Sequence, residues 1–166
     1  MAWTKLTEIV STATADDYPS ETITALDWLF VVGEMTGTGD TRINFQLGSG
    51  GSVDTNTNYF QRYSPDYSGT WSTNNSTDGI RGDLPNSGSQ TTYFNYLIQN
   101  IDGFRKNIQC DQVLRNGQND TNAPLSMRLW GTWNETDQAN IINFENRETG
   151  SFTSIKATVW GTDYNT

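Results

Sequence analysis

Apolar and polar side chains alternate with a period of two along several stretches of this chain, and that alternation constrains the fold more than any other feature. The stretch 125–133 places Leu125, Met127 and Leu129 on one face of an extended strand. No segment shows the 3.6-residue apolar repeat of an amphipathic helix. Gly, Asn and Asp separate the alternating stretches. The pattern predicts an all-β chain of about eight to ten short strands, folded as an antiparallel β-sandwich or jelly roll.

The stretch 125–161 gives the clearest local prediction. Polar turn residues at 134–137 and further on divide it into three strands, 125–133, 140–146 and 151–161. Because short polar turns usually join antiparallel neighbours, we expect these strands to lie side by side in one sheet. Such a unit cannot bury its apolar face alone, so the rest of the chain must supply a second layer.

A hairpin is predicted in the first third of the chain. The most apolar run is 22–35, and its uninterrupted part 28–32 fits either a helix core or a strand. Its length and β-branching favour a central strand that is buried on both faces, with a bulge at Gly33. Residues 42–47 alternate cleanly, with the apolar members facing inward and the polar members facing outward. The loop 36–40 between them indicates that the two strands pair directly.

Two further stretches read as strands. Residues 91–99 and 104–114 flank an Asp-Gly dipeptide, which favours a hairpin turn. Cys110 falls on the apolar face of the second of these strands, so it is expected in the core. Residues 6–15 are expected to form the first strand, and 16–19 a turn that contains proline.

Residues 48–89 form a long polar region with embedded aromatic side chains. A loop of that length without secondary structure is unusual inside a compact domain, so at least one short strand is expected near 59–63. At 166 residues the chain has the size of one ordinary domain. We therefore expect residues 1–166 to form a single β-sandwich.

Composition excludes several classes of function. The net charge is −9 with ten Lys plus Arg, and phosphate contact needs a basic face, so no nucleic-acid partner is expected. No stretch approaches the ~20 apolar residues of a membrane helix, and the first residues lack a secretion signal, so we expect a soluble, unexported chain. A single cysteine is compatible with a reducing cytosol. Six Trp favour a folded chain over a disordered one.

Candidate catalytic and metal sites are few. The sequence contains no His, which rules out Ser-His-Asp and Cys-His arrangements and imidazole metal ligands. Carboxylate-only catalysis needs a pair of acids, and no spacing singles one out. Asp54, Asn56 and Asn58 have a spacing that suits Ca²⁺, but Tyr59 stands where an EF-hand loop needs Gly. We interpret this stretch as a polar loop with Asx turns, and expect a non-enzyme without metal or cofactor.

Aromatic side chains give the best candidates for binding. Tyr59, Tyr63, Tyr67 and Trp71 recur every fourth residue, but Pro and Gly between them break any helix, so they are expected to decorate a long loop. Aromatic rings on a polar loop can stack on sugars or anchor a protein interface. Alternatively they fold under the loop as a small satellite cluster. The two indoles near the turn at 134–137 are candidates for packing or for an interface: Trp130 and Trp133.

Four stretches follow one another in a recognisable order: RINFQLGSGG with Asn58-Tyr59 after it, YFNYLIQNIDGFRK, RLWGTWNETDQANIINF and GSFTSIKATVWG. This order resembles that of β-sandwich proteins of tailed-phage virions, namely the decoration (cement) proteins of the capsid exterior and related distal tailspike domains. The resemblance covers most of the chain from Arg42 onward. It implies a homotrimer, made in the bacterial cytoplasm, that binds the major capsid protein on the outer surface of the virion.

A cement protein stabilises the head by contact area, since many modest contacts multiplied by symmetry resist internal pressure. The resemblance carries no catalytic residue. The alternative function is a carbohydrate-binding module, or a tailspike or tail-tip domain, that recognises host-surface glycans. The two classes share a fold, so the fold cannot separate them. What separates them is whether the aromatic side chains face solvent as a sugar-binding surface or lie buried against another chain.

Overall fold

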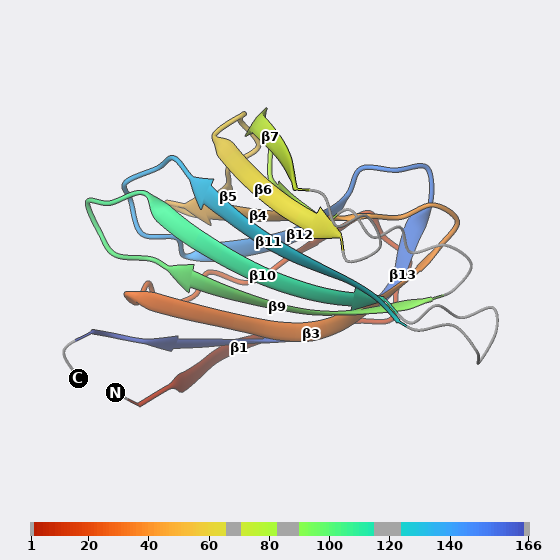
Figure 1. The fold of residues 1–166 in the computed structure, drawn as a ribbon. Coiled ribbons are helices and arrows are strands. Elements are labelled where there is room, and N and C mark those ends of the chain that lie inside the picture. The colour runs from red at the N-terminus through yellow and green to blue at the C-terminus, as the bar shows by residue number, and fades with distance from the viewer. Residues whose placement is uncertain (1, 66–70, 83–89, 115–123, 165–166) are drawn as a thin grey trace.

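The computed structural model describes residues 2–65, 71–82, 90–114 and 124–164. The described part is all-β, and its two antiparallel sheets pack face to face as a β-sandwich (Figure 1), which confirms the predicted fold class. The strands are β1 (Thr4–Ser11), β2 (Asp17–Pro19), β3 (Trp28–Thr38), β4 (Ile43–Ser49), β5 (Ser52–Val53), β6 (Tyr59–Pro65), β7 (Ser72–Thr77), β8 (Ile80–Arg81), β9 (Thr91–Gln99), β10 (Lys106–Leu114), β11 (Leu125–Trp133), β12 (Ile141–Asn146) and β13 (Ser151–Thr162).

The larger sheet has the strand order β1-β13-β3-β9-β10-β11-β6-β7. The smaller sheet has the order β2-β12-β4-β5, and β8 also pairs with β4. Among the described residues, ten strands have six residues or more and three are shorter. The predicted number of eight to ten was low because two- and three-residue strands are too short to show an alternating pattern.

The core lies between the two sheets. Phe45 from the smaller sheet stacks on Tyr96 from the larger one, with ring centroids 3.9 Å apart, and Phe144 packs edge-on against both. Cys110 is fully buried here, as its position on an apolar face predicted. Such aromatic contacts add about 0.5–1.5 kcal/mol each beyond their buried area.

The hairpin predicted around the Asp-Gly dipeptide is confirmed. Strands β9 and β10 pair in register from Gln99 opposite Asn107 to Thr92 opposite Leu114. Gly103 in the turn has φ = 75°, a left-handed conformation that glycine adopts without strain. A strand near 59–63 is also confirmed, as β6.

The predicted meander of 125–161 is wrong. Strand β11 lies between β10 and β6, β13 lies between β1 and β3, and β12 belongs to the smaller sheet. The strands themselves are correctly placed along the chain. Their partners were not predictable from the alternation, because an inward-facing apolar face looks the same whichever sheet carries it.

The hairpin predicted for 28–35 and 42–47 fails for the same reason, since β3 and β4 lie in opposite sheets. Strand β4 is buried on both faces rather than one. Its predicted outward residues Asn44 and Gln46 are covered, and they donate hydrogen bonds to Glu145 Oε2 and to the backbone oxygen of Asp78.

Strand β3 is an interior strand, as expected, but it is not buried on both faces. Leu29 and Val31 point into the core, whereas Val32 is 41% exposed on the outer face. Gly33 makes no bulge, because it pairs in continuous register with Ala157 and Phe94. A Cβ at Gly33 would lie 2.5 Å from the backbone oxygen of Lys156, so close packing explains the glycine.

The predicted turn at 16–19 is partly the short strand β2, which pairs with β12 at the edge of the smaller sheet. Proline is tolerated there because an edge strand leaves some backbone N–H groups unpaired. No helix in the described part of the chain is long and apolar enough to span a membrane.

Candidate functional site

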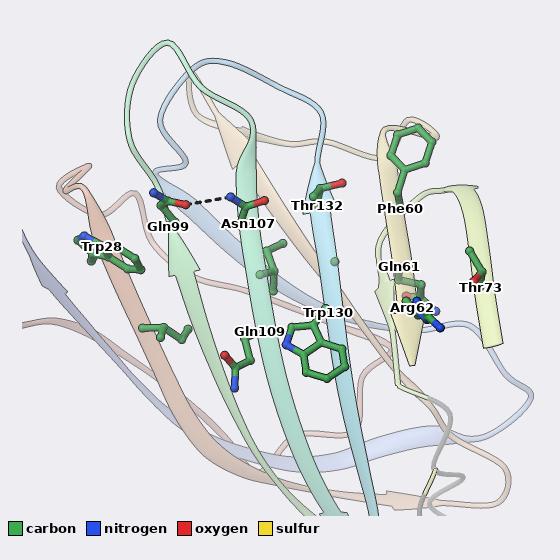
Figure 2. A pocket seen from close by; sticks show the side chains of 13 residues that line it. Trp28, Phe60, Gln61, Arg62, Thr73, Gln99, Asn107, Gln109, Trp130 and Thr132 are labelled. Atoms are coloured by element: carbon green, nitrogen blue, oxygen red, sulfur yellow. Dashed lines mark hydrogen bonds between the residues drawn. The ribbon is translucent and has the colours of Figure 1, made fainter. Parts of the chain in front are cut away.

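The outer face of the larger sheet carries a groove that runs across six neighbouring strands, β3, β9, β10, β11, β6 and β7 (Figure 2). Its volume of about 610 Å³ is in the range of small-molecule binding sites. Neighbouring strands are ~4.8 Å apart, so a groove across six strands is roughly 24 Å long. The lining residues are Trp28, Phe60, Gln61, Arg62, Thr73, Leu97, Gln99, Asn107, Ile108, Gln109, Trp130, Gly131 and Thr132.

Strand register arranges the outward side chains of the groove in two transverse rows. Residues two apart on a strand share a face, so β9, β10, β11 and β6 each give one side chain to each row. Strands β3 and β7 each give a single side chain, Trp28 and Thr73. The Trp28 row consists of Trp28, Gln99, Asn107, Thr132 and Phe60. The Trp130 row consists of Leu97, Gln109, Trp130, Arg62 and Thr73.

The backbone between the two rows forms the floor of the groove. Gln61 and Ile108 turn their side chains into the interior, and both are almost fully buried. Gly131 has no room for a side chain, because a Cβ there would lie 2.4 Å from Ile80 Cδ1 in the core. The floor therefore carries no outward side chain at these positions, and the two rows project on either side of it.

The Trp28 row has an aromatic ring at each end and polar groups in the middle. In Figure 2 Trp28 and Phe60 stand at opposite ends, with Gln99, Asn107 and Thr132 between them. Asn107 Nδ2 donates a hydrogen bond to Gln99 Oε1 over 2.9 Å. The bond fixes both amides side by side, and leaves the Gln99 amide NH₂ and the Asn107 carbonyl oxygen facing the groove as a donor and an acceptor.

The Trp130 row ends in a cluster of two indoles and a guanidinium. Trp130 and Arg62 are directly opposite each other on β11 and β6. Trp71, which immediately precedes β7, stacks on Trp130 with ring centroids 4.7 Å apart. The guanidinium carbon of Arg62 lies 5.3 Å from the centroid of Trp71, which is a cation–π contact.

The charge of the groove differs from that of the chain. The chain as a whole has 19 acidic and 10 basic residues. The residues that line the groove, all within the described part, include one cation, Arg62, and no carboxylate. A ligand in the groove therefore meets a neutral to positive surface on an otherwise acidic protein.

Tyr59 and Tyr63 do not lie on the long loop that was predicted for them. Tyr59 and Tyr63 lie on β6 and turn inward, and Tyr59 is fully buried with its hydroxyl bonded to the Leu47 backbone. Burial raises the pKa of the Tyr59 phenol far above its usual range. Trp71 is 40% exposed beside the groove. Tyr67 lies outside the described residues.

The two indoles of β11 have opposite environments. Trp130 is 43% exposed in the groove, whereas Trp133 is fully buried. Trp133 Nε1 donates a 2.7 Å hydrogen bond to Asp54 Oδ2, and its ring stacks on Tyr59. Trp133 is thus a core residue within its own subunit.

The Asp54 loop is an Asx turn, as its composition predicted, because the Asn56 N–H donates to Asp54 Oδ1 over 2.9 Å. Burial acts to raise the pKa of Asp54, but hydrogen bonds from Trp133, Asn58 and Asn56 outweigh it and hold the pKa below its usual range. Across residues 2–65, 71–82, 90–114 and 124–164 no group of three or more His, Cys, Asp or Glu side chains could hold a metal ion.

Most groove residues were not singled out in the sequence. The signal was present for part of them, because the hairpin turn at Asp102-Gly103 sets Gln99 opposite Asn107. Extending that register to the neighbouring strands requires their order in the sheet. The alternation alone does not give that order.

Comparison with known proteins gives no match: no family model, no curated protein and no solved structure is significantly similar to the chain. Function must therefore be inferred from the side chains of the groove.

Proposed function

We propose that the protein binds carbohydrate, holding an oligosaccharide across the groove on the outer face of the larger sheet. The observation that carries the proposal is the composition of the two rows, which combine aromatic rings with amide and hydroxyl groups. Such a surface matches a sugar, which has apolar C–H faces and a rim of hydroxyl groups.

The amides suit hydroxyl groups because each offers both a donor and an acceptor. Gln99 and Asn107 are held in place by their mutual hydrogen bond. Side chains already fixed before binding lose less conformational freedom when a ligand arrives, which favours affinity. The rings of Trp28 and Trp130 lie near these amides and supply flat apolar surface.

The shape of the groove favours a chain of sugars over a monosaccharide. A trough of roughly 24 Å, open across the sheet, leaves room for several linked sugars, with the strands running across the ligand. Single sugars would contact only one of the two indoles. Affinity is therefore expected to rise with oligosaccharide length until the groove is filled.

The test is a glycan array followed by calorimetric titration of the best ligand. Trp130→Ala and Trp28→Ala should each weaken binding by about tenfold or more, equivalent to ~1.4 kcal/mol. Trp3→Ala is the matched control, because Trp3 is a similarly exposed indole (43%) outside the groove. Absence of glycan binding by the wild-type protein, or equal losses in all three variants, would contradict the proposal.

Virion attachment is the second candidate, and it rests on the resemblance together with one surface feature. Val32, Tyr93 and Val113 are exposed at 41%, 49% and 39% on the outer face, outside the groove. Tyr93 and Val113 are cross-strand neighbours. Exposed apolar groups gathered on one face favour contact with another chain, here another copy in a trimer or the major capsid protein.

Virion attachment is tested by the mass of the protein in solution and by co-sedimentation with purified capsids. Tyr93→Asp should abolish both trimer formation and capsid binding if this patch is the contact, and Phe104→Asp, at an exposed aromatic in the β9–β10 turn, is the control. A wild-type monomer that does not sediment with capsids would overturn this candidate. The two candidates use different parts of the outer face, so both activities can belong to one protein.

A further inference from the structure

We propose that the oligosaccharide is acidic and sparsely charged, and that Arg62 pairs with the negatively charged group of one sugar in the bound segment. This inference rests on the proposed carbohydrate binding and specifies its ligand class. It is carried by the place of Arg62 in the Trp130 row, by its contact with Trp71 and by the absence of carboxylates among the described lining residues.

Four other arginines among the described residues have carboxylate partners. Arg42 pairs with Glu148, Arg81 with Asp78, and Arg147 with Glu145. Arg128, on the same outer face, donates to Asp111 over 2.9 Å. Arg62 instead contacts an aromatic ring, and within the described residues it makes no ion pair. In a chain with 19 acidic residues, this leaves the charge of Arg62 available to a ligand.

The contact with Trp71 prepares Arg62 for an anion. A guanidinium that packs on an indole keeps its N–H groups directed outward from the ring, and its fork matches the two oxygens of a carboxylate. Because Trp71 also stacks on Trp130, the ring that would hold a sugar and the cation that would hold its acid group are fixed relative to each other. A sugar on Trp130 therefore places a carboxylate substituent within reach of the neighbouring residue on β6.

The charge balance limits how acidic the ligand can be. Arg62 is the single cation among the described lining residues, and the protein carries a net charge of −9. A densely sulfated chain would be repelled by the protein as a whole. A glycan with one carboxylate in each short repeat gains the pairing with Arg62, and its remaining hydroxyls meet the amides of the two rows.

The experiment compares three oligosaccharide preparations of equal length by calorimetry at low salt. They are hyaluronan fragments, with one carboxylate per disaccharide, the same fragments with their carboxylates reduced to alcohols, and heparin fragments as the densely charged probe. Wild-type protein should bind the hyaluronan fragments at least tenfold more tightly than the reduced ones. That preference should shrink as salt is raised, and heparin should bind more weakly than hyaluronan.

Arg62→Gln should abolish the preference, because it weakens binding of the acidic fragments much more than binding of the reduced ones. Arg62→Lys should restore part of it. Arg128→Gln is the matched control, since Arg128 is exposed on the same face outside the groove, and it should keep the preference. Trp130→Ala should weaken binding of acidic and reduced fragments alike.

Each result is informative. Equal or tighter binding of the reduced fragments by wild-type protein, or a preference that survives in Arg62→Gln, would overturn the acidic ligand while carbohydrate binding stands. No binding of any fragment, with an empty glycan array, would overturn carbohydrate binding itself. Tighter binding of heparin would overturn the requirement for sparse charge.

Discussion

Trp71 and Trp130 stack with ring centroids 4.7 Å apart and planes 20° from parallel, although strand β6 lies between the strands to which they are attached. Trp130 lines the groove and Trp71 does not. Trp71 instead packs against the two side chains, Trp130 and Arg62, that form that end of the groove. We therefore regard Trp71 as a positioning residue, which acts on a ligand through its neighbours.

Replacement of Trp71 should impair glycan binding without direct loss of a ligand contact. In Trp71→Ala, the indole of Trp130 and the guanidinium of Arg62 each lose a stacking partner and gain rotamer freedom, so affinity should fall about fivefold to tenfold. Calorimetric titration measures the loss, and near-ultraviolet circular dichroism should report the lost indole pair. Trp71→Phe should recover much of the affinity, whereas a purely structural role would lower thermal stability without this recovery.

The hydrogen bond between Trp133 and Asp54 gives a second prediction. Asp54→Ala removes the acceptor of a buried indole N–H and the hub of the Asx turn, so the free energy of unfolding should fall by about 2–3 kcal/mol. Asp16→Ala removes an exposed carboxylate and should change it by less than about 0.5 kcal/mol. Urea denaturation monitored by Trp fluorescence measures both.

The Asp54 carboxylate should also make the free energy of unfolding depend on pH in the acidic range. The pKa of Asp54 is lower in the folded protein than in the unfolded chain, so its contribution is present above its ordinary pKa of ~3.9 and is lost as pH falls through the folded value. Wild-type stability should therefore fall below about pH 4 more steeply than that of Asp54→Ala. Equal slopes for the two proteins would contradict this assignment.

The sequence allowed prediction of which segments are strands better than of which strands are neighbours. Strands β9 and β10 were predicted as a pair because a favourable turn joins them directly. Strands β3 and β4, or β11 and β12, follow each other in the chain but lie in opposite sheets. Their alternation is satisfied on either side of one core, so only long-range packing chooses between the sheets.

The groove was not predictable from the sequence for the same reason, because it depends on which strands are neighbours. Trp130 was recognised as a candidate, but the residues opposite it depend on strand β6 lying beside β11, and no local signal in the polar region 48–89 specifies that pairing. Tyr59 and Tyr63 drew attention by their spacing, yet the inward face of β6 buries them and leaves Arg62 outside. Binding residues on a sheet can be read only once the register of all its strands is known.

Three buried groups should make the free energy of unfolding fall at alkaline pH. Burial raises the pKa of Tyr59, Tyr96 and Cys110, which ionise near 10 and 8.5 in an unfolded chain. Above these values the unfolded state releases protons that the folded state retains, so stability is full below about pH 8.5 and falls as pH rises. Each group lowers the free energy of unfolding by at most ~1.4 kcal/mol per pH unit above its unfolded pKa.

Urea denaturation from pH 8 to pH 11 measures this fall. Tyr59→Phe should reduce the slope above pH 10 by the share of one group, and Cys110→Ala should reduce it from about pH 8.5 upward. Tyr164→Phe is the control, because Tyr164 is 63% exposed. A stability that stays constant between pH 9 and pH 11 would contradict the burial of all three groups.

The last prediction concerns Lys106, a fully buried cation at the start of β10. Its Nζ donates hydrogen bonds to the backbone oxygens of Ile101, Phe104 and Thr136, at 2.8, 2.5 and 2.8 Å. The ammonium therefore joins the β9–β10 turn, which adjoins Gln99 and Asn107 of the groove, to the segment that crosses from β11 to β12. Two of these oxygens also accept backbone hydrogen bonds, Thr136 from the Gly103 N–H over 3.0 Å and Ile101 from the Phe104 N–H over 3.4 Å.

Lys106→Met preserves the aliphatic stem but removes the ammonium donor from all three carbonyls, so the free energy of unfolding should fall by about 1–3 kcal/mol. Lys156→Met, at an exposed position on β13, should have little effect. Hydrogen exchange should show faster opening of the β9–β10 turn in Lys106→Met, because the turn keeps the Gly103–Thr136 backbone hydrogen bond but loses the ammonium that also joins it to the crossing segment. If exchange accelerates uniformly instead, or stability is unchanged, Lys106 does not hold these two segments together.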